Sequence, residues 1–198
     1  ARMCFKEMIQ VKLEETDKVI ECLNNHGIVA FPTDTVFGLG CLRDDTEAID
    51  KIYEAKNRSI SKRLPVMVSS LKMASRMVEI SEKDTKLFEA FAPGPITFIF
   101  RLKDKDDTLA IRMPDDRWIL NLIEKLDKPM CVTSANTSGK ASLFKYEDVI
   151  KDIGEGIDMI VKGDARGESS STIVDCVNDY KILREGPISE EKIREVLK

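Results

Sequence analysis

The sequence predicts an α/β layer architecture. Short apolar segments of strand type alternate along the chain with segments in which apolar residues recur at helical spacing, and this alternation is typical of α/β folds. The chain has 198 residues, 42% of them hydrophobic, which suffices for one core. Residues 1–198 contain no repeat, no low-complexity segment and no long linker, so we expect a single domain.

Helices are predicted where apolar residues recur every three to four positions between start and stop signals. The clearest start is Ser81, a good N-cap followed by acids in the first turn of a helix over 82–91. The clearest stop is Gly27, shortly after the apolar face of a helix over 15–25. The segments expected to be helical are 15–25, 46–56, 71–78, 82–91, 115–126, 145–153 and a last one that starts at Ser189.

Strands are predicted where a short apolar run is bounded by turn residues. The run 28–32 ends in a proline, and the run 96–102 follows the strong breaker Ala92-Pro93-Gly94-Pro95. The segments expected to be strands are 28–32, 64–69, 96–102, 108–113, 130–132, 157–161, 172–176 and 180–184.

Three polar turns follow apolar strands, and ligands of open α/β sheets bind at the carboxyl ends of strands. Residues 33–40, 133–142 and 163–171 are therefore candidates for one shared site. In the first turn, the hydroxyls of Thr33 and Thr35 could bind a small polar ligand, although an ordinary Thr/Asp turn has the same composition. The second turn could hold an anion with hydroxyls and main-chain N–H groups, or could be a polar surface loop.

A basic segment stands out in a chain whose net charge is −4. Lys56, Arg58, Lys62 and Arg63 fall within residues 56–63 with no acid between them. Arginine presents a planar fork that suits phosphate oxygens, and lysine adds a mobile point charge. The alternative is a solvated helix end whose cations lie near the negative pole of the helix dipole.

Two arginines in apolar strands indicate anionic partners. An unpaired buried charge is costly, so Arg112 must reach either a structural carboxylate or the carboxylate of a ligand, and we favour the ligand. Arg184 ends another apolar strand, and the same argument applies to it more weakly.

Several classes of site are not indicated. The five cysteines are scattered without a CxxC pair, and His26 is the single histidine, so neither a zinc site nor a Cys–His couple is predicted. Scattered cysteines and the lack of a leader or a bilayer-length apolar stretch indicate a reduced, cytoplasmic protein without a membrane partner. The sequence contains no Walker-type loop, no GxGxxG and no acid pair with hydrolytic spacing.

The ordered motifs of the chain resemble those of the YrdC/Sua5 family, the L-threonylcarbamoyladenylate synthases. The resemblance runs from about Gly27 to about Pro187, and is carried by FPTDTVFGLG, KNR with a downstream lysine, APGPITFIF, AIRMP, TSAN.SG, SSTIVD and ILREGPI. It implies one YrdC/RibB-like domain, a twisted open mixed sheet around a central positively charged cavity. It also implies a nucleotidyltransferase that condenses L-threonine, bicarbonate or CO2 and ATP, with Mg2+, to threonylcarbamoyl-AMP and pyrophosphate.

This reaction is the first step toward N6-threonylcarbamoyladenosine at position 37 of tRNA. A Kae1-type complex would be the downstream partner, and tRNA is a further partner that the resemblance allows. No resident metal site is implied.

The resemblance also implies roles for individual positions. It makes Lys56 and Arg58 the catalytic residues. The residues that would bind ATP are Arg58, Lys62, Thr108, Ser134, Ser142 and Arg184. The residues that would bind L-threonine are Thr35, Met67, Arg112, Val132 (through its backbone) and Ser171.

Three positions depart from the family pattern. Arg63 stands where the family usually has proline, and Met67 stands where some members have a histidine near threonine. The loop 162–168 lacks the common Asp-Gly-Gly start, so its role in closing over the site is open. Two other functions remain as alternatives: an RNA-binding module that uses the same basic cavity without turnover, and a carbamoyl-transfer relative of the hydrogenase-maturation type.

Overall fold

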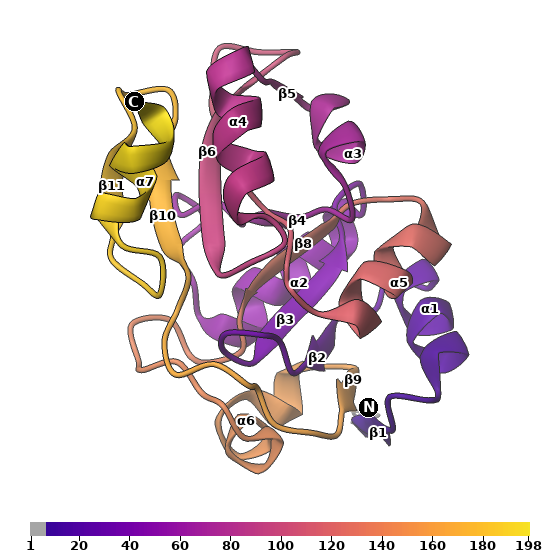
Figure 1. The fold of residues 1–198 in the computed structure, drawn as a ribbon. Coiled ribbons are helices and arrows are strands. Elements are labelled where there is room, and N and C mark those ends of the chain that lie inside the picture. The colour runs from indigo at the N-terminus through magenta and orange to yellow at the C-terminus, as the bar shows by residue number, and fades with distance from the viewer. Residues whose placement is uncertain (1–6) are drawn as a thin grey trace.

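The computed structural model describes residues 7–198, which form a single mixed sheet flanked by helices (Figure 1). Cys4 lies outside the described residues. The sheet has 11 strands in the order β1-β9-β2-β3-β8-β4-β7-β6-β10-β11, with β5 paired to β6. In residues 7–198, no helix is both long enough and apolar enough to cross a membrane.

The strands are short, and most pair with strands that are distant in the sequence. Their bounds are β1 (Ile9–Val11), β2 (Val29–Phe31), β3 (Gly38–Leu42), β4 (Val66–Met67), β5 (Val78–Glu79), β6 (Ile96–Leu102), β7 (Thr108–Arg112), β8 (Met130–Ser134), β9 (Met159–Val161), β10 (Thr172–Asp175) and β11 (Lys181–Arg184). Four pairs are parallel, β1/β9, β2/β9, β4/β7 and β6/β10, and the others are antiparallel.

The helices begin at the caps that the sequence predicts in several cases. The predicted starts Ser81 and Ser189 each accept a hydrogen bond from a backbone N–H in the first turn, and Ser81 forms a full capping box with Asp84. Asp116, which lies inside the helix expected over 115–126, is the N-cap of a helix that begins at Arg117. The helices are α1 (Thr16–Asn24), α2 (Thr46–Lys56), α3 (Leu71–Ser75), α4 (Glu82–Phe91), α5 (Arg117–Leu126), α6 (Tyr146–Ile153), the 3₁₀ turn η1 (Gly154–Gly156) and α7 (Glu190–Leu197).

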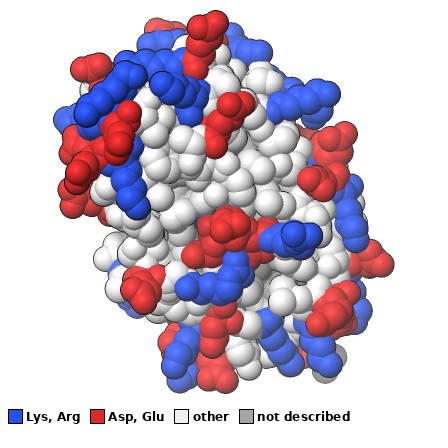
Figure 2. Space-filling view, in the orientation of Figure 1, with Lys and Arg blue, Asp and Glu red and all other residues white. Residues whose placement is uncertain are grey.

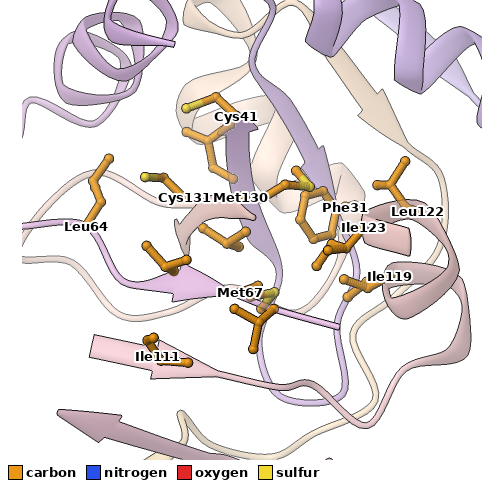
Figure 3. Packing of buried hydrophobic residues seen from close by; sticks show 14 of the residues in the cluster. Phe31, Cys41, Leu64, Met67, Ile111, Ile119, Leu122, Ile123, Met130 and Cys131 are labelled. Atoms are coloured by element: carbon orange, nitrogen blue, oxygen red, sulfur yellow. The ribbon is translucent and has the colours of Figure 1, made fainter. Parts of the chain in front are cut away.

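Apolar side chains from strands and helices form a continuous core (Figure 3). Phe31 of β2 meets Trp118 of α5 with ring centroids 5.9 Å apart, where α1 and α5 lie together (Figure 1). Phe98 of β6 meets Phe88 of α4 at 5.1 Å, and α7 packs against α4 at the C-terminal end of the sheet. Helix α4 thus covers the face of β6 that carries Phe98, and the residues on either side of Phe98 point to the opposite face of the strand.

Two of the predicted elements need correction. The helix expected over 71–78 ends at Ser75, and Val78 instead belongs to β5, which pairs with β6. The strand expected over 130–132 continues to Ser134, so the second polar turn begins inside a strand. In both cases the pairing with a neighbouring strand decides the conformation, which local spacing does not encode.

The sequence analysis predicts neither β1, which pairs with the distant β9, nor β3, whose two glycines favour a turn. Both glycines of β3 instead allow close packing in the middle of the sheet. A Cβ atom at Gly40 would lie 3.1 Å from the Cys131 carbonyl oxygen of β8, and one at Gly38 would lie 3.1 Å from Val132. Neither glycine is among the residues with positive φ, so close approach and not unusual backbone geometry explains them.

Candidate active site

A cavity of about 420 Å3 opens on one face of the central strands. Its wall includes alternate residues of several strands, such as Thr97 and Ile99 of β6, or Ala110 and Arg112 of β7. Side chains two apart in a strand share a face, so Thr97 and Ile99 direct the same face of β6 to the cavity. The intervening residues, such as Phe98, point into the core.

All three polar turns that the sequence singles out contribute to this cavity. Backbone hydrogen bonds connect the first turn with the second, from Phe37 to Leu143 and from Ala135 to Phe37. The hydroxyls of Ser142 and Ser170, 3.5 Å apart, connect the second turn with the third. The lining residues from the turns are Thr33, Thr35, Val36, Gly38, Thr133, Ser134, Ser142, Ser170 and Ser171. The prediction of one shared site is therefore correct.

Arg112 forms one end of the cavity and has a carboxylate partner. Its Nη1 atom donates to Asp34 at 2.7 Å, and its Nη2 atom lies 3.3 Å from the hydroxyl of Thr35. Both charged side chains are almost fully buried, with 7% and 9% of their surface exposed. The sequence analysis favours a ligand carboxylate over a structural one as the partner of Arg112. In the structure the partner is a structural carboxylate, that of Asp34. The guanidinium also lines the cavity.

Arg184 also lines the cavity and has hydroxyl and carbonyl partners. Its Nε atom donates to the Ser171 carbonyl at 2.9 Å, and its Nη2 atom donates to the Ser171 hydroxyl at 3.1 Å. Ser171 in turn lies 2.7 Å from the hydroxyl of Thr97. Partial burial lowers the pKa of Arg184, and the positive charge of Arg112 lowers it further. An anion bound between these two arginines would relieve their repulsion.

Arg58 organises the loop that follows α2. Its Nε atom donates to the Lys62 carbonyl at 3.1 Å, and its Nη2 atom donates to the Arg63 carbonyl at 2.8 Å. The hydroxyl of Tyr53 donates to the same Lys62 carbonyl at 2.7 Å. Arg58 and Arg63 line the cavity, whereas the exposed Lys62 is not among the lining residues.

Lys56 is buried beside the cavity and does not line it. Its ammonium group donates to the carbonyl of Ser134 and to that of Asn136, the latter at 2.7 Å. Burial lowers the pKa of Lys56 to about 8, and the charge of Arg58 adds to this effect. Lys56 therefore holds the end of β8 and the following turn in place. The resemblance implies a catalytic role for Lys56, and this stays a prediction; the geometry shows that its ammonium group supports the main chain of this turn.

The loop 162–168 is tied to the first polar turn. The backbone N–H groups of Arg166 and Gly167 donate to the carbonyls of Thr33 and Thr35, both at 3.0 Å. The guanidinium of Arg166 donates to Asp116 at 2.9 Å. The loop thus supports the backbone of the residues that face Arg112.

The predicted site residues fall into two groups. Those that line the cavity are Thr35, Arg58, Met67, Thr108, Arg112, Val132, Ser134, Ser142, Ser171 and Arg184. Lys56 and Lys62 lie outside the lining. Arg63 of the basic segment and Ser170 of the third polar turn also line the cavity, although neither received an individual role, and Thr97 is a lining residue that the sequence analysis did not single out. Polar residues inside an apolar strand, as at Thr97, were the signal that could have found one of them.

The cavity and the outer surface differ in their charge. Within the described part of the chain, no carboxylate lines the cavity. Four arginines do so, namely Arg58, Arg63, Arg112 and Arg184. On the face shown in Figure 2, in contrast, basic and acidic side chains are interspersed around a broad uncharged area.

The fold and the site define an α/β protein with an open cavity that suits phosphate and carboxylate ligands. The model of the Sua5/YciO/YrdC family, described as telomere recombination, matches residues 21–186, and the chain belongs to this family. This confirms the resemblance inferred from the ordered motifs.

Two relatives and one solved structure illustrate the similarity. The chain is 37% identical over 187 residues to the threonylcarbamoyl-AMP synthase of Bacillus subtilis, covering 88% of this chain and 54% of that protein. It is 27% identical over 185 residues to the protein of the same name from Vibrio campbellii, covering 88% of this chain and 100% of that one. The crystal structure of P. abyssi Sua5 complexed with L-threonine superposes with a TM-score of 0.87 at 30% identity, covering 96% of this chain and 60% of that chain. This similarity confirms the predicted α/β fold with a mixed sheet.

Proposed function

We propose that this chain is an L-threonylcarbamoyladenylate synthase, which condenses L-threonine, bicarbonate or CO2 and ATP to threonylcarbamoyl-AMP and pyrophosphate. The observation that carries the proposal is the lining of the cavity, which among the described residues combines four arginines, including Arg112 and Arg184, with several hydroxyls and no carboxylate. Such a cavity suits two anionic ligands, a carboxylate and a phosphate chain. The names of the relatives and their match over most of this chain support the same reaction.

The amino-acid half of the site lies around Arg112. Asp34 occupies one edge of its guanidinium fork, which fixes the plane of the group and leaves other N–H donors for a substrate carboxylate. The hydroxyls of Thr33 and Thr35 lie 3.2 Å apart beside it and are buried. They offer donors and acceptors to the polar groups of a small amino acid. The Sua5 structure complexed with L-threonine supports L-threonine as the ligand here.

The nucleotide half lies between Arg58 and Arg184. Ser134, Ser142 and Thr108 line this part of the wall and offer hydroxyl donors. Arg58 is already oriented by the carbonyls of its own loop, so little side-chain entropy is lost when it meets a phosphate. Positioned guanidiniums and hydroxyls of this kind stabilise the charge that develops during phosphoryl or nucleotidyl transfer.

The proposed chemistry needs no covalent enzyme intermediate. The amine of L-threonine adds to CO2, loses a proton and becomes a carbamate. A carbamate oxygen then attacks the α-phosphorus of ATP, the bond from that phosphorus to the bridging oxygen breaks, and pyrophosphate leaves. The protein contributes mainly by holding the two substrates in line and by stabilising charge on the phosphates.

Mg2+ is proposed as part of the substrate MgATP. Magnesium prefers carboxylate, phosphate and water oxygens in octahedral geometry. The lining residues in the described part of the chain offer hydroxyls and carbonyls but no carboxylate, so the phosphates themselves are the natural ligands of the ion. The product would then be consumed by a Kae1-type transfer complex that acts on adenosine 37 of tRNA.

The experiment is an assay of pyrophosphate release by the purified chain with ATP, L-threonine and bicarbonate. We expect release to require all three, and Arg58→Ala to lower kcat/KM about tenfold to a hundredfold, which corresponds to the loss of one charge-assisted phosphate contact. Arg76→Ala is the matched control, because Arg76 is an exposed arginine that pairs with Asp127 and does not line the cavity. Pyrophosphate release that does not depend on L-threonine would contradict the proposal.

A further inference from the structure

Arg63 connects two walls of the cavity that are far apart in the sequence. Arg63 lies in the loop between α2 and β4, and its side chain reaches the turn between β6 and β7. There its Nη1 atom donates to the Thr108 carbonyl at 3.0 Å, and its Nη2 atom pairs with the carboxylate of Asp107. Thr108 itself lines the cavity, as does Arg63. The guanidinium therefore sits at the cavity wall, between the loop and the hairpin.

Most donors of this guanidinium remain available. An arginine carries five N–H donors in a planar fork, and the contacts with Thr108 and Asp107 use only part of them. The side chain is 57% exposed, so it is solvated in the unliganded protein. A solvated, partly oriented guanidinium at a cavity wall can take up a phosphate oxygen without breaking its contact with the hairpin carbonyl.

The position of Arg63 is coupled to that of Arg58. Arg58 donates to the carbonyl of Arg63, so the two residues are held next to each other. Among the described residues, Arg58 has no acid within ion-pair distance, whereas Arg63 has Asp107. Lys62, which lies between them in the basic segment, is exposed and is not among the lining residues. Arg63 is thus the second cation that this segment brings to the cavity wall.

We infer that Arg63 binds the phosphate chain of the nucleotide beside Arg58, and that Asp107 is its counterion in the unliganded state. This inference rests on the proposed function, because it assigns Arg63 to the polyphosphate part of that site. Asp107 orients the guanidinium, but its negative charge also opposes the approach of a phosphate. Loss of Arg63 and loss of the Asp107 charge should therefore change phosphate affinity in opposite directions.

This sign difference separates a phosphate ligand from a mere structural link. If Arg63 only joined the loop to the hairpin, Arg63→Ala would remove both contacts and weaken binding, and Asp107→Asn, which loses the ion pair but keeps the bond to the Thr108 carbonyl, would weaken binding in the same direction and to a smaller extent. If Arg63 binds phosphate, Asp107→Asn leaves the cation in place and removes a repulsive charge.

The experiment is calorimetric titration of the full chain with inorganic pyrophosphate at fixed ionic strength. We expect Arg63→Ala and Arg63→Gln to raise the Kd for pyrophosphate about tenfold to a hundredfold. We expect Asp107→Asn to lower this Kd or to leave it unchanged. Arg101→Ala is the matched control, because Arg101 lies in the same hairpin, pairs with its neighbour Asp106 at 3.1 Å and is not among the lining residues. Thermal unfolding of each variant verifies that it is folded.

Two results would overturn the inference. The first is a Kd for Arg63→Ala and Arg63→Gln equal to that of the wild type. The second is a Kd for Asp107→Asn above that of the wild type. A wild type that binds no pyrophosphate would overturn it as well, and threonine-dependent pyrophosphate release, measured separately, would then show whether the proposed function still holds.

Discussion

Lys56 supports the backbone of the candidate site from a buried position beside the cavity. Its side chain is only 1% exposed, and its ammonium satisfies two main-chain carbonyls of the turn that carries Ser134. Removing the ammonium would take its donor from the Asn136 carbonyl and leave the Ser134 carbonyl with the backbone N–H of Asn136 at 3.1 Å. A buried acceptor left without a donor costs about 1–3 kcal/mol. We therefore interpret the basic segment 56–63 as having two functions. Lys56 supports the backbone of the neighbouring turn, and Arg58 and Arg63 are placed to contact a ligand.

The lowered pKa of Lys56 predicts a specific pH dependence of stability. The pKa of Lys56 is about 8 in the folded protein, and its ordinary value, which applies in the unfolded state, is 10.5. Between these two pH values the unfolded state therefore binds more protons than the folded state. The penalty for the buried charge is full below pH 8 and fades as the pH rises toward 10.5. The free energy of unfolding of the wild type should thus increase relative to that of Lys56→Met, by at most about 1.4 kcal/mol per pH unit.

Urea unfolding of both proteins at several pH values between 7 and about 10.5 measures this difference, and the subtraction removes the titration of all other groups. A difference that stays flat, or that falls with rising pH, would refute the assignment of the lowered pKa to Lys56.

The buried pair Arg112–Asp34 allows stability and ligand binding to be separated. Arg112→Ala leaves the Asp34 carboxylate buried without its cation, which should lower the free energy of unfolding by about 3–5 kcal/mol. The double variant Arg112→Ala/Asp34→Asn removes that uncompensated charge and should recover part of the stability. Neither variant should bind L-threonine measurably, because both lack the guanidinium for its carboxylate.

Chemical denaturation and calorimetric titration with L-threonine test the two parts in parallel. If the double variant regained L-threonine binding together with stability, Arg112 would be a structural residue only.

At the scale of elements, the site depends on how the loop 162–168 packs on the first polar turn. A Cβ atom at Gly167 would lie 2.5 Å from the Cα atom and the carbonyl oxygen of Thr35, closer than any side chain tolerates. The backbone bonds from this loop to Thr33 and Thr35 require that approach. The loop therefore takes part in positioning the hydroxyls of Thr33 and Thr35. It has this supporting role although it lacks the Asp-Gly-Gly start that is common in the family.

Gly167→Ala should consequently weaken the amino-acid half of the site more than the nucleotide half. We expect the KM for L-threonine to increase about tenfold, since the turn must shift, while the KM for ATP changes little. Glu168→Ala in the same loop is the control, because Glu168 is exposed and is not among the lining residues. Steady-state kinetics with each substrate varied in turn would show the difference, and equal changes in both KM values would argue against this role of the loop.

At the scale of the whole molecule, the cavity lining and the outer surface differ in how their charges are arranged: among the described residues the lining has four arginines and no carboxylate, whereas surface charges of both signs are interspersed on the face in Figure 2. The chain has a net charge of −4, and the face in Figure 2 shows basic and acidic residues side by side. Proteins that bind RNA through their backbone contacts usually present a continuous basic surface. This distribution favours small anionic ligands over RNA, and so does not favour the alternative of an RNA-binding module.

We accordingly expect tRNA to compete poorly for the cavity. Pyrophosphate release should be unaffected by tRNA at physiological salt, and filter binding should give only weak affinity that falls further with added salt. Inhibition of pyrophosphate release by tRNA at micromolar concentration would instead indicate that the nucleic acid reaches the arginines of the cavity.

The sequence alone determined which segments form helices and strands in most cases, and which family the chain belongs to. The physical reason is that these properties are local: apolar spacing, caps such as Ser81 and breakers such as Pro93 act within a few residues. It also identified the three polar turns as one site, because strand ends of one sheet meet at a common edge. Its errors, β1, β3 and the segment around Val78, are strands that form through pairing with their neighbours.

Only the tertiary structure decided what the long charged side chains contact. Lys56 reaches a carbonyl 78 residues further along the chain, Arg112 reaches an acid 78 residues earlier, and Arg63 reaches a hairpin 45 residues away. A flexible cation can meet any of several oxygens, and the choice depends on which segments the sheet brings beside it. That choice makes Lys56 a support, gives Arg112 a fixed plane and places Arg63 at the wall of the cavity.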